Sequence, residues 1–147
     1  MMKPTSVGSP PAVSAPASVL SALRRLAGAA RPQEACGALL GRCEYGVWWE
    51  IATIITVPNA ASSPDKGFLI PAEIVRSLER AALDSGLQLV GFFHSHPQGG
   101  ACASATDNAL AWPGYLYGIV DGHSGDLRFW TLDPDRATLI EVRTTIV

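Results

Sequence analysis

The chain has 147 residues, of which 48% are hydrophobic and 16% charged, and its formal net charge is −2. This length and composition indicate one globular domain that buries a core without disulfide bonds. The charge offers no basic field for nucleic acid or an anionic membrane, no apolar run approaches the ~20 residues of a membrane span, and no charged region followed by an apolar stretch marks a signal peptide.

The N-terminal segment differs in composition from the rest of the chain. Residues 1–17 are mostly Pro, Ser and Ala, and such a segment buries too little surface to offset its ordering entropy. We therefore expect a flexible leader over 1–17 and a folded domain over 18–147. The first predicted helix covers residues 18–30, where leucines and alanines recur at helical spacing, and Pro32 ends it.

The remaining elements follow from β-branched runs, turn residues and one more helical stripe. Strands are predicted at 36–41, 45–57, 68–70, 87–93, 115–122, 126–132 and 138–147, and a second helix runs from Pro71 to Gly86. Helices and strands alternate early in the chain, and the last strands follow one another as hairpins. This order predicts an α/β fold, with a mixed, mainly antiparallel curved sheet flanked by helices.

Two of the three histidines are separated by a single residue. His94 and His96 are at the end of the predicted central strand, where side chains two residues apart share a face, and Pro97 ends the strand. Ser104 and Asp107 follow after the loop QGGACA. Two imidazoles and a carboxylate are ligands that zinc takes in a catalytic site. Such a site also needs a nearby carboxylate that moves protons without binding the metal.

Each part of this pattern has a simpler explanation when it is taken alone. Ser104 with Asp107 also fits a capping box at a helix start, which is compatible with metal binding. His94 and His96 alone could be polar residues at a strand end. Their combination favours the metal site.

These residues resemble the signature of the JAMM/MPN+ metallopeptidase family, which is His-Ser-His-Pro, six residues, then Ser-x-x-Asp. "RPQEACGALLG" (31–41) resembles the upstream block that carries the family's glutamate, here Glu34, and "VPNAASSPDKGFLIP" (57–71) resembles the middle stretch. The resemblance runs from about residue 18 to about 133. Ala103 departs from it, because many members have proline there. The family's fold is a sandwich similar to that of cytidine deaminases.

The resemblance implies a role for each residue. His94, His96 and Asp107 would bind one zinc ion per chain. Glu34 would take a proton from zinc-bound water and pass it to the departing nitrogen. Ser104 would donate a hydrogen bond to the developing oxyanion. The reaction would be hydrolysis of a peptide or isopeptide bond.

Ser95, between the two histidines, would hold the local loop and take no part in the chemistry. Glu34 has a weak local signal, since a glutamate at an element boundary is usually a solvated residue.

The substrate expectation also comes from the resemblance. The short chain resembles the bacterial branch, in which some members trim residues after the C-terminal Gly-Gly of small ubiquitin-like (β-grasp) sulfur-carrier proteins and so expose the glycine carboxylate for thiocarboxylate formation. We expect such a carrier as the partner, in sulfur or siderophore metabolism, because a slim Gly-Gly tail can pair with a sheet edge beside the metal. The alternatives are a peptidase of cell-wall or phage-tail type and a non-catalytic MPN-like scaffold.

The cysteines bear on location and regulation. Cys36, Cys43 and Cys102 lack CxxC spacing, which argues against disulfides and favours a reducing cytoplasm. Cys102 lies between the second histidine and Ser104, so its thiolate could occupy the open zinc position. An exposed sheet edge would also allow a homodimer.

Overall fold

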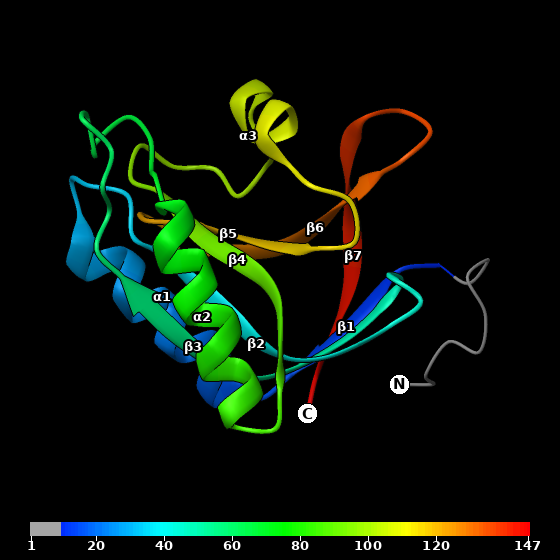
Figure 1. Cartoon of the computed structure of the whole chain (residues 1–147). Helices are drawn as coiled ribbons and strands as arrows, with labels where there is room; N and C mark the ends of the chain where they lie inside the picture. Colours follow the sequence, from blue (N-terminus) through cyan, green and yellow to red (C-terminus); the bar gives the residue numbers. More distant parts are fainter. Residues whose placement is uncertain (1–9) are drawn as a thin grey trace.

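The fold is known from a computed structural model, which describes residues 10–147. In chain order the elements are β1 (Ala12–Ala15), α1 (Ala17–Ala30), β2 (Cys36–Glu44), β3 (Trp48–Val57), α2 (Ala72–Asp84), β4 (Gln88–His96), α3 (Ala105–Leu110), β5 (Leu116–Asp121), β6 (Leu127–Asp133) and β7 (Thr138–Ile146) (Figure 1). The two long helices and the alternation of early strands with helices confirm the mixed α/β class. Phe68–Ile70, expected as a short strand, has no regular structure.

The sheet is a closed ring, which corrects the expectation of a curved sheet that helices flank. Its strand order is β1-β3-β2-β4-β5-β6-β7, with β7 paired to β1. The pairs β2–β3, β2–β4, β5–β6 and β6–β7 are antiparallel, and β1–β3, β1–β7 and β4–β5 are parallel. The difference arises because β1 pairs with both β3 and β7. Its pairing with β3 covers only residues 48–50, so the described sheet keeps an open edge along residues 51–57, and the homodimer stays a prediction.

Strand β1 lies within the segment expected to be a flexible leader, so that boundary is wrong for its last residues. All four residues of β1 are buried, and Val13 lies opposite Trp49 of β3 and Thr144 of β7. The small side chains of this strand fit between two neighbours, and the pairing satisfies its backbone groups. The rest of that expectation, over residues 1–9, lies outside the described residues.

The two long helices pack on opposite faces of β2 and β4. Helix α1 buries Val19, Leu20, Leu23 and Ala27 in the larger core cluster, which also contains Leu39, Trp49, Phe93 and Phe129. Helix α2 buries Leu78 and Ala82 in a smaller cluster with Cys36, Ala38 and Leu40. Successive residues of β2 thus face different helices, as the period of two along a strand requires. Strand β4 is held rigidly between these layers.

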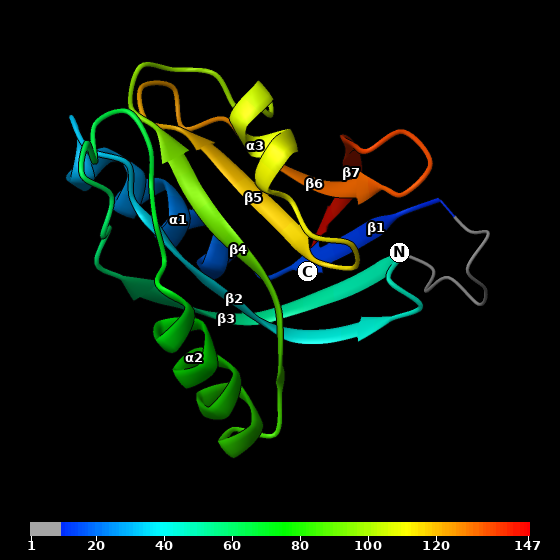
Figure 2. The ribbon, with the colours of Figure 1, turned by 45° about the horizontal axis from the view of Figure 1, so that its top comes forward.

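Strand β4 is central because residues 91–94 have a neighbouring strand on each side. It is antiparallel to β2 and parallel to β5, and β5 lies beside it beneath α3 (Figure 2). Gly91 allows β4 to approach β5 closely, since a Cβ there would lie 1.8 Å from the carbonyl oxygen of Leu116. The end of β4, which carries His94 and His96, is therefore held closely against β5.

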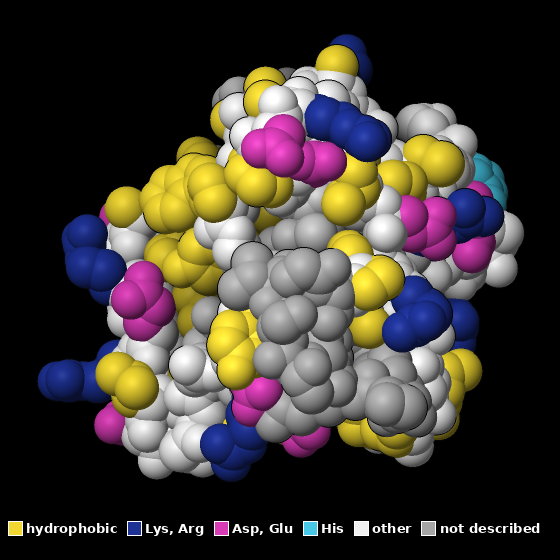
Figure 3. All heavy atoms as spheres, turned by 90° about the vertical axis from the view of Figure 1, so that its right-hand side faces the viewer, with side chains coloured by type: hydrophobic (Ala, Val, Ile, Leu, Met, Phe, Trp, Pro, Cys, Tyr) yellow, Lys and Arg dark blue, Asp and Glu magenta, His cyan; other side chains and the backbone are white. Residues whose placement is uncertain are grey.

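The surface shows no separation of charge on the face beside β1 and the β6–β7 turn. Basic, acidic and hydrophobic side chains are interspersed there (Figure 3).

Within residues 10–147, no helix has the length and apolar character needed to cross a membrane.

Candidate metal centre

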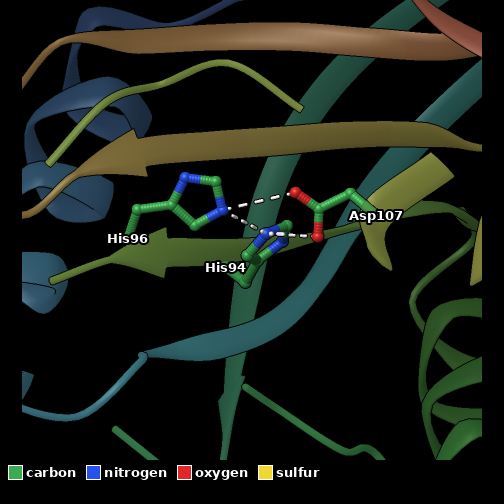
Figure 4. Close-up of side chains that lie close together, drawn as sticks. All are labelled: His94, His96 and Asp107. Atoms are coloured by element: carbon green, nitrogen blue, oxygen red, sulfur yellow. Dashed lines mark hydrogen bonds and ion pairs between the residues drawn. The ribbon is translucent and has the colours of Figure 1, made fainter. Parts of the chain in front are cut away.

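The last residues of β4 bring two imidazoles to one point. His94 and His96 point from the same face of the strand toward Asp107, which belongs to α3 (Figure 4). The Nε2 atoms of the histidines lie 3.2 Å apart. The Asp107 carboxylate faces both, with Oδ1 at 3.1 Å from Nε2 of His94 and Oδ2 at 3.3 Å from Nε2 of His96. Among the described residues these three form the group that could hold a metal ion.

Helix α3 begins with a capping box that also fixes Asp107. The Ser104 hydroxyl oxygen accepts the Asp107 N–H at 3.0 Å, and Oδ2 of Asp107 accepts the Ser104 N–H at 2.9 Å. The capping explanation is therefore confirmed, and the same carboxylate also faces the histidines. The hydroxyl of Ser104 acts as acceptor in this bond, so its proton is left to donate elsewhere.

The spacing of the donor atoms fits a tetrahedral ion. With metal–ligand bonds of about 2.0–2.1 Å, two ligands of a tetrahedral zinc ion are about 3.3 Å apart. The separations of 3.1, 3.2 and 3.3 Å between the side chains of His94, His96 and Asp107 agree with this value. Nδ1 of His96 lies 3.0 Å from the carbonyl oxygen of Gly100. If Nδ1 carries the proton and donates it there, Nε2 is left free to bind a metal.

The charges in the group favour an ionised Asp107. Burial opposes the charge, but hydrogen bonds from both imidazoles outweigh it and hold the pKa of Asp107 far below its ordinary value. The Asp107 carboxylate in turn raises the pKa of His96, against a smaller opposing effect of burial. Without a metal, the site therefore holds an anion beside an imidazole that gains a proton readily.

Glu34 lies on the wall of the same cavity, 60 residues before His94 in the chain. The cavity has a volume of about 680 Å³, and Glu34, His94, His96, Ser104 and Asp107 all line it. Burial raises the pKa of Glu34, and the nearby histidines partly oppose this effect. A half-buried carboxylate with a raised pKa is suited to accept and release a proton.

Two polar side chains fix the segment that carries Glu34. Oγ of Ser95 accepts the N–H of Ala35 at 2.8 Å, while the N–H of Ser95 donates to the carbonyl of Ala35. Ser95 thus fastens the Glu34 segment to β4, a distant segment and not the local loop that the sequence suggested. The amide of Asn59 donates to the carbonyl of Glu34 at 3.1 Å and also binds the 58–70 loop, through the carbonyls of Pro64 and Gly67 and the N–H groups of Ala61 and Leu69.

The sequence did not identify the aromatic residues beside the metal group. The ring of Phe68 stacks on His94 with 4.5 Å between centroids, and it also lines an apolar groove of about 250 Å³ that adjoins the cavity. Trp112 lies in that groove with 63% of its surface exposed. The only sequence signal for this groove was the density of aromatic residues at 112–117.

The cysteines occupy different environments. Cys36 is buried, and burial raises the pKa of its thiol to about 11. Cys102 is exposed and does not line the cavity. In this structure Cys102 is therefore not placed to occupy an open metal position, which counts against the hypothesis that its thiolate binds there.

Comparison with known proteins places the chain in a recognised family. The family described as prokaryotic homologs of the JAB domain matches residues 16–133, which is most of the chain. The chain belongs to this family, and the resemblance to JAMM/MPN+ proteins is confirmed.

Several relatives share this fold. A desampylase of Haloferax volcanii is 34% identical over 128 residues, covering 85% of this chain and 89% of the relative. A solution structure of a Salinibacter ruber protein is 31% identical with a TM-score of 0.70, covering 91% of each chain. A Desulfitobacterium hafniense protein at 23% identity has a TM-score of 0.78 over 92% of each chain. A JAB1/MPN domain protein of Archaeoglobus fulgidus, at 19% identity, has a TM-score of 0.55 and covers 91% of this chain and 98% of its own.

Proposed function

We propose that this chain is a zinc-dependent peptidase or isopeptidase that hydrolyses the bond after the C-terminal Gly-Gly of a ubiquitin-like sulfur-carrier protein. The similarity to a desampylase supports a hydrolase of the JAB type that acts on a ubiquitin-like protein conjugate. The observation that carries the proposal is the position of Glu34 on the wall of the cavity that His94, His96 and Asp107 line. A scaffold protein has no use for a half-buried carboxylate with a raised pKa at this place.

Each residue has a distinct task in this proposal. His94, His96 and Asp107 would hold the zinc ion, which supplies a nucleophile at neutral pH by lowering the pKa of water to about 7. The Glu34 carboxylate would move a proton from the attacking water to the leaving nitrogen. The free hydroxyl proton of Ser104 donates to the oxygen of the attacked carbonyl, where negative charge develops.

The groove supplies a path for the protein substrate. Phe68, Leu110 and Tyr117 line both the groove and the cavity, so the two are continuous. Leu69, Leu110 and Trp112 expose more than half of their surface there. An extended tail can lie along this apolar surface while its Gly-Gly segment, which has no bulky side chains, reaches the metal group.

The test uses the full chain loaded with one zinc ion and several small carriers extended beyond Gly-Gly. Mass spectrometry should show carriers shortened to the terminal glycine. The variant Glu34→Gln should bind zinc normally and lose activity by about 10²- to 10⁴-fold. Glu50→Gln, which alters an exposed glutamate on β3, is the matched control and should cleave normally. If no carrier is cut, or if Glu34→Gln stays active, the proposed function is wrong.

A further inference from the structure

The carbonyl of Gly100 is the partner of His96, so its position decides how that imidazole is oriented. It lies 3.0 Å from Nδ1 of His96, whose Nε2 faces Asp107 and His94. In the neutral ring one proton is shared between two competing sites, Nδ1 facing Gly100 and Nε2 facing Asp107. Only the Nδ1–H form leaves Nε2 free for a metal. The Gly100 carbonyl therefore favours the tautomer that can bind.

The loop that presents this carbonyl is intrinsically flexible. Gly99 and Gly100 are adjacent, with φ of +103° and +90°, a backbone conformation that favours glycine. Two neighbouring glycines have more conformational freedom to lose than any other pair of residues. A fixed carbonyl at Gly100 therefore requires an anchor outside the loop.

Two anchors come from outside the loop: Nε1 of Trp130 donates to the carbonyl of Ala101 at 3.0 Å, and Asp121, at the end of β5, binds Gly100 itself. Its Oδ2 accepts the N–H of Gly100 at 2.9 Å, a charge-assisted bond that is stronger than a bond between neutral groups. Its Oδ1 accepts two other N–H groups, from His123 at 2.8 Å and Ser124 at 3.1 Å, which form the β5–β6 turn. One carboxylate oxygen thus holds the turn and the other holds the loop.

The position of Asp121 is itself set by the sheet. Asp121 lies opposite His96 in the parallel register of β4 and β5, and its own N–H donates to the carbonyl of Asp126 across the turn. Three N–H groups around its carboxylate also hold the pKa of Asp121 below its ordinary range. It therefore stays ionised, and it does not line the cavity.

We propose that Asp121 is a positioning residue for His96, because it fixes the Gly100 backbone and thereby the tautomer and ring orientation that metal binding needs. The proposal deepens the proposed function, since it assigns a support to one metal ligand of that site. Asp121 touches neither the substrate nor the reacting atoms.

Because one oxygen of Asp121 binds the turn and the other binds the loop, a single substitution can remove the loop bond alone. Asp121→Asn can keep its oxygen on the turn, but it then presents an NH₂ group to the N–H of Gly100, so it loses only the loop bond. Asp121→Ala loses both sets of bonds. His123→Ala is the matched control, because it removes a side chain of the same turn, with its exposed hydrogen bond to Arg31, and keeps the backbone N–H that Asp121 binds.

Two measurements without substrate test the proposal. Zinc affinity, measured by competition with a chelator, should fall by about tenfold in Asp121→Asn, the lower end of the range for partners of metal ligands. NMR of the ring nitrogens in the metal-free protein, at alkaline pH where the His96 ring is neutral, should show His96 in Asp121→Asn shifting from the Nδ1–H form toward Nε2–H. His123→Ala should match the wild type in both.

Unchanged zinc affinity and an unchanged His96 tautomer in Asp121→Asn would overturn the proposal. So would an equal loss in His123→Ala, which would indicate a general loosening of the turn. A wild-type chain that does not bind zinc would overturn it as well. A chain that binds zinc and shows these effects but cuts no carrier would refute only the proposed function.

Discussion

Replacing Ser95 with alanine should damage both the stability and the activity of the protein. The side chain of Ser95 is 1% exposed and accepts the N–H of Ala35 at 2.8 Å. Ser95→Ala leaves that N–H without this acceptor in a part-buried place, and an unsatisfied buried donor costs about 1–3 kcal/mol. For a chain of this size a loss of about 2 kcal/mol lowers the melting temperature by about 4–8 °C.

The loss of activity should exceed what this destabilisation explains. Ala35 adjoins Glu34, so its release lets the proton-transferring carboxylate drift, and a displacement of this kind can cost up to about 100-fold in rate. Thermal unfolding measures the loss of stability. Zinc titration and carrier cleavage are then compared at a temperature where the variant is folded, and zinc affinity should remain close to wild type.

The matched control is Ser77→Ala on α2, where the hydroxyl of Ser77 donates to a carbonyl in an exposed helix. This change should leave all three measurements nearly unaltered. A Ser95→Ala protein that unfolds at the wild-type temperature would refute the energetic argument. One that is destabilised but cleaves at the wild-type rate would refute the link between Ser95 and Glu34.

Three further outcomes follow from the same geometry. Trp112→Ala should raise the KM for the carrier about tenfold, ~1.4 kcal/mol, whereas Leu83→Ala, also exposed but outside the groove, should not. Burial raises the folded-state pKa of Glu34, so the folded wild type loses stability as pH rises and this carboxyl group ionises. In the absence of metal, Glu34→Gln should therefore have a higher melting temperature than the wild type at pH 8 and the same melting temperature at pH 4. Gly91→Ala should fail to yield folded protein, since its Cβ would overlap the Leu116 carbonyl; a soluble variant with wild-type melting would contradict this.

The metal group could be predicted from the sequence because its signal is local. His94 and His96 share a strand face by the period of two, and Ser104 with Asp107 fits a helix start. Both patterns lie within 14 residues, and the structure places all four side chains on one cavity. The position of Glu34 followed only from the family resemblance, since nothing in its own neighbourhood distinguishes it from other glutamates at element boundaries.

The parts that could not be predicted depend on contacts between distant segments. The sequence Ala12–Ala15 looks like part of a low-complexity leader, and only the two neighbouring strands make it a strand. Ring closure follows from that pairing. The groove could not be predicted either, because composition alone does not tell a buried aromatic residue from one that lines a groove, as Trp112 does.

The pairing of β1 with β7 has a consequence for how the protein is made. These strands lie side by side although about 130 residues separate them in the chain, with Val13 opposite Thr144. Contacts between such distant segments form late, because closing the long intervening loop costs entropy before the contact contributes any favourable free energy. On a ribosome, the first strand gains β7 as its second partner only after residue 146 has left the exit tunnel, so the ring closes after all of its other strands have been made.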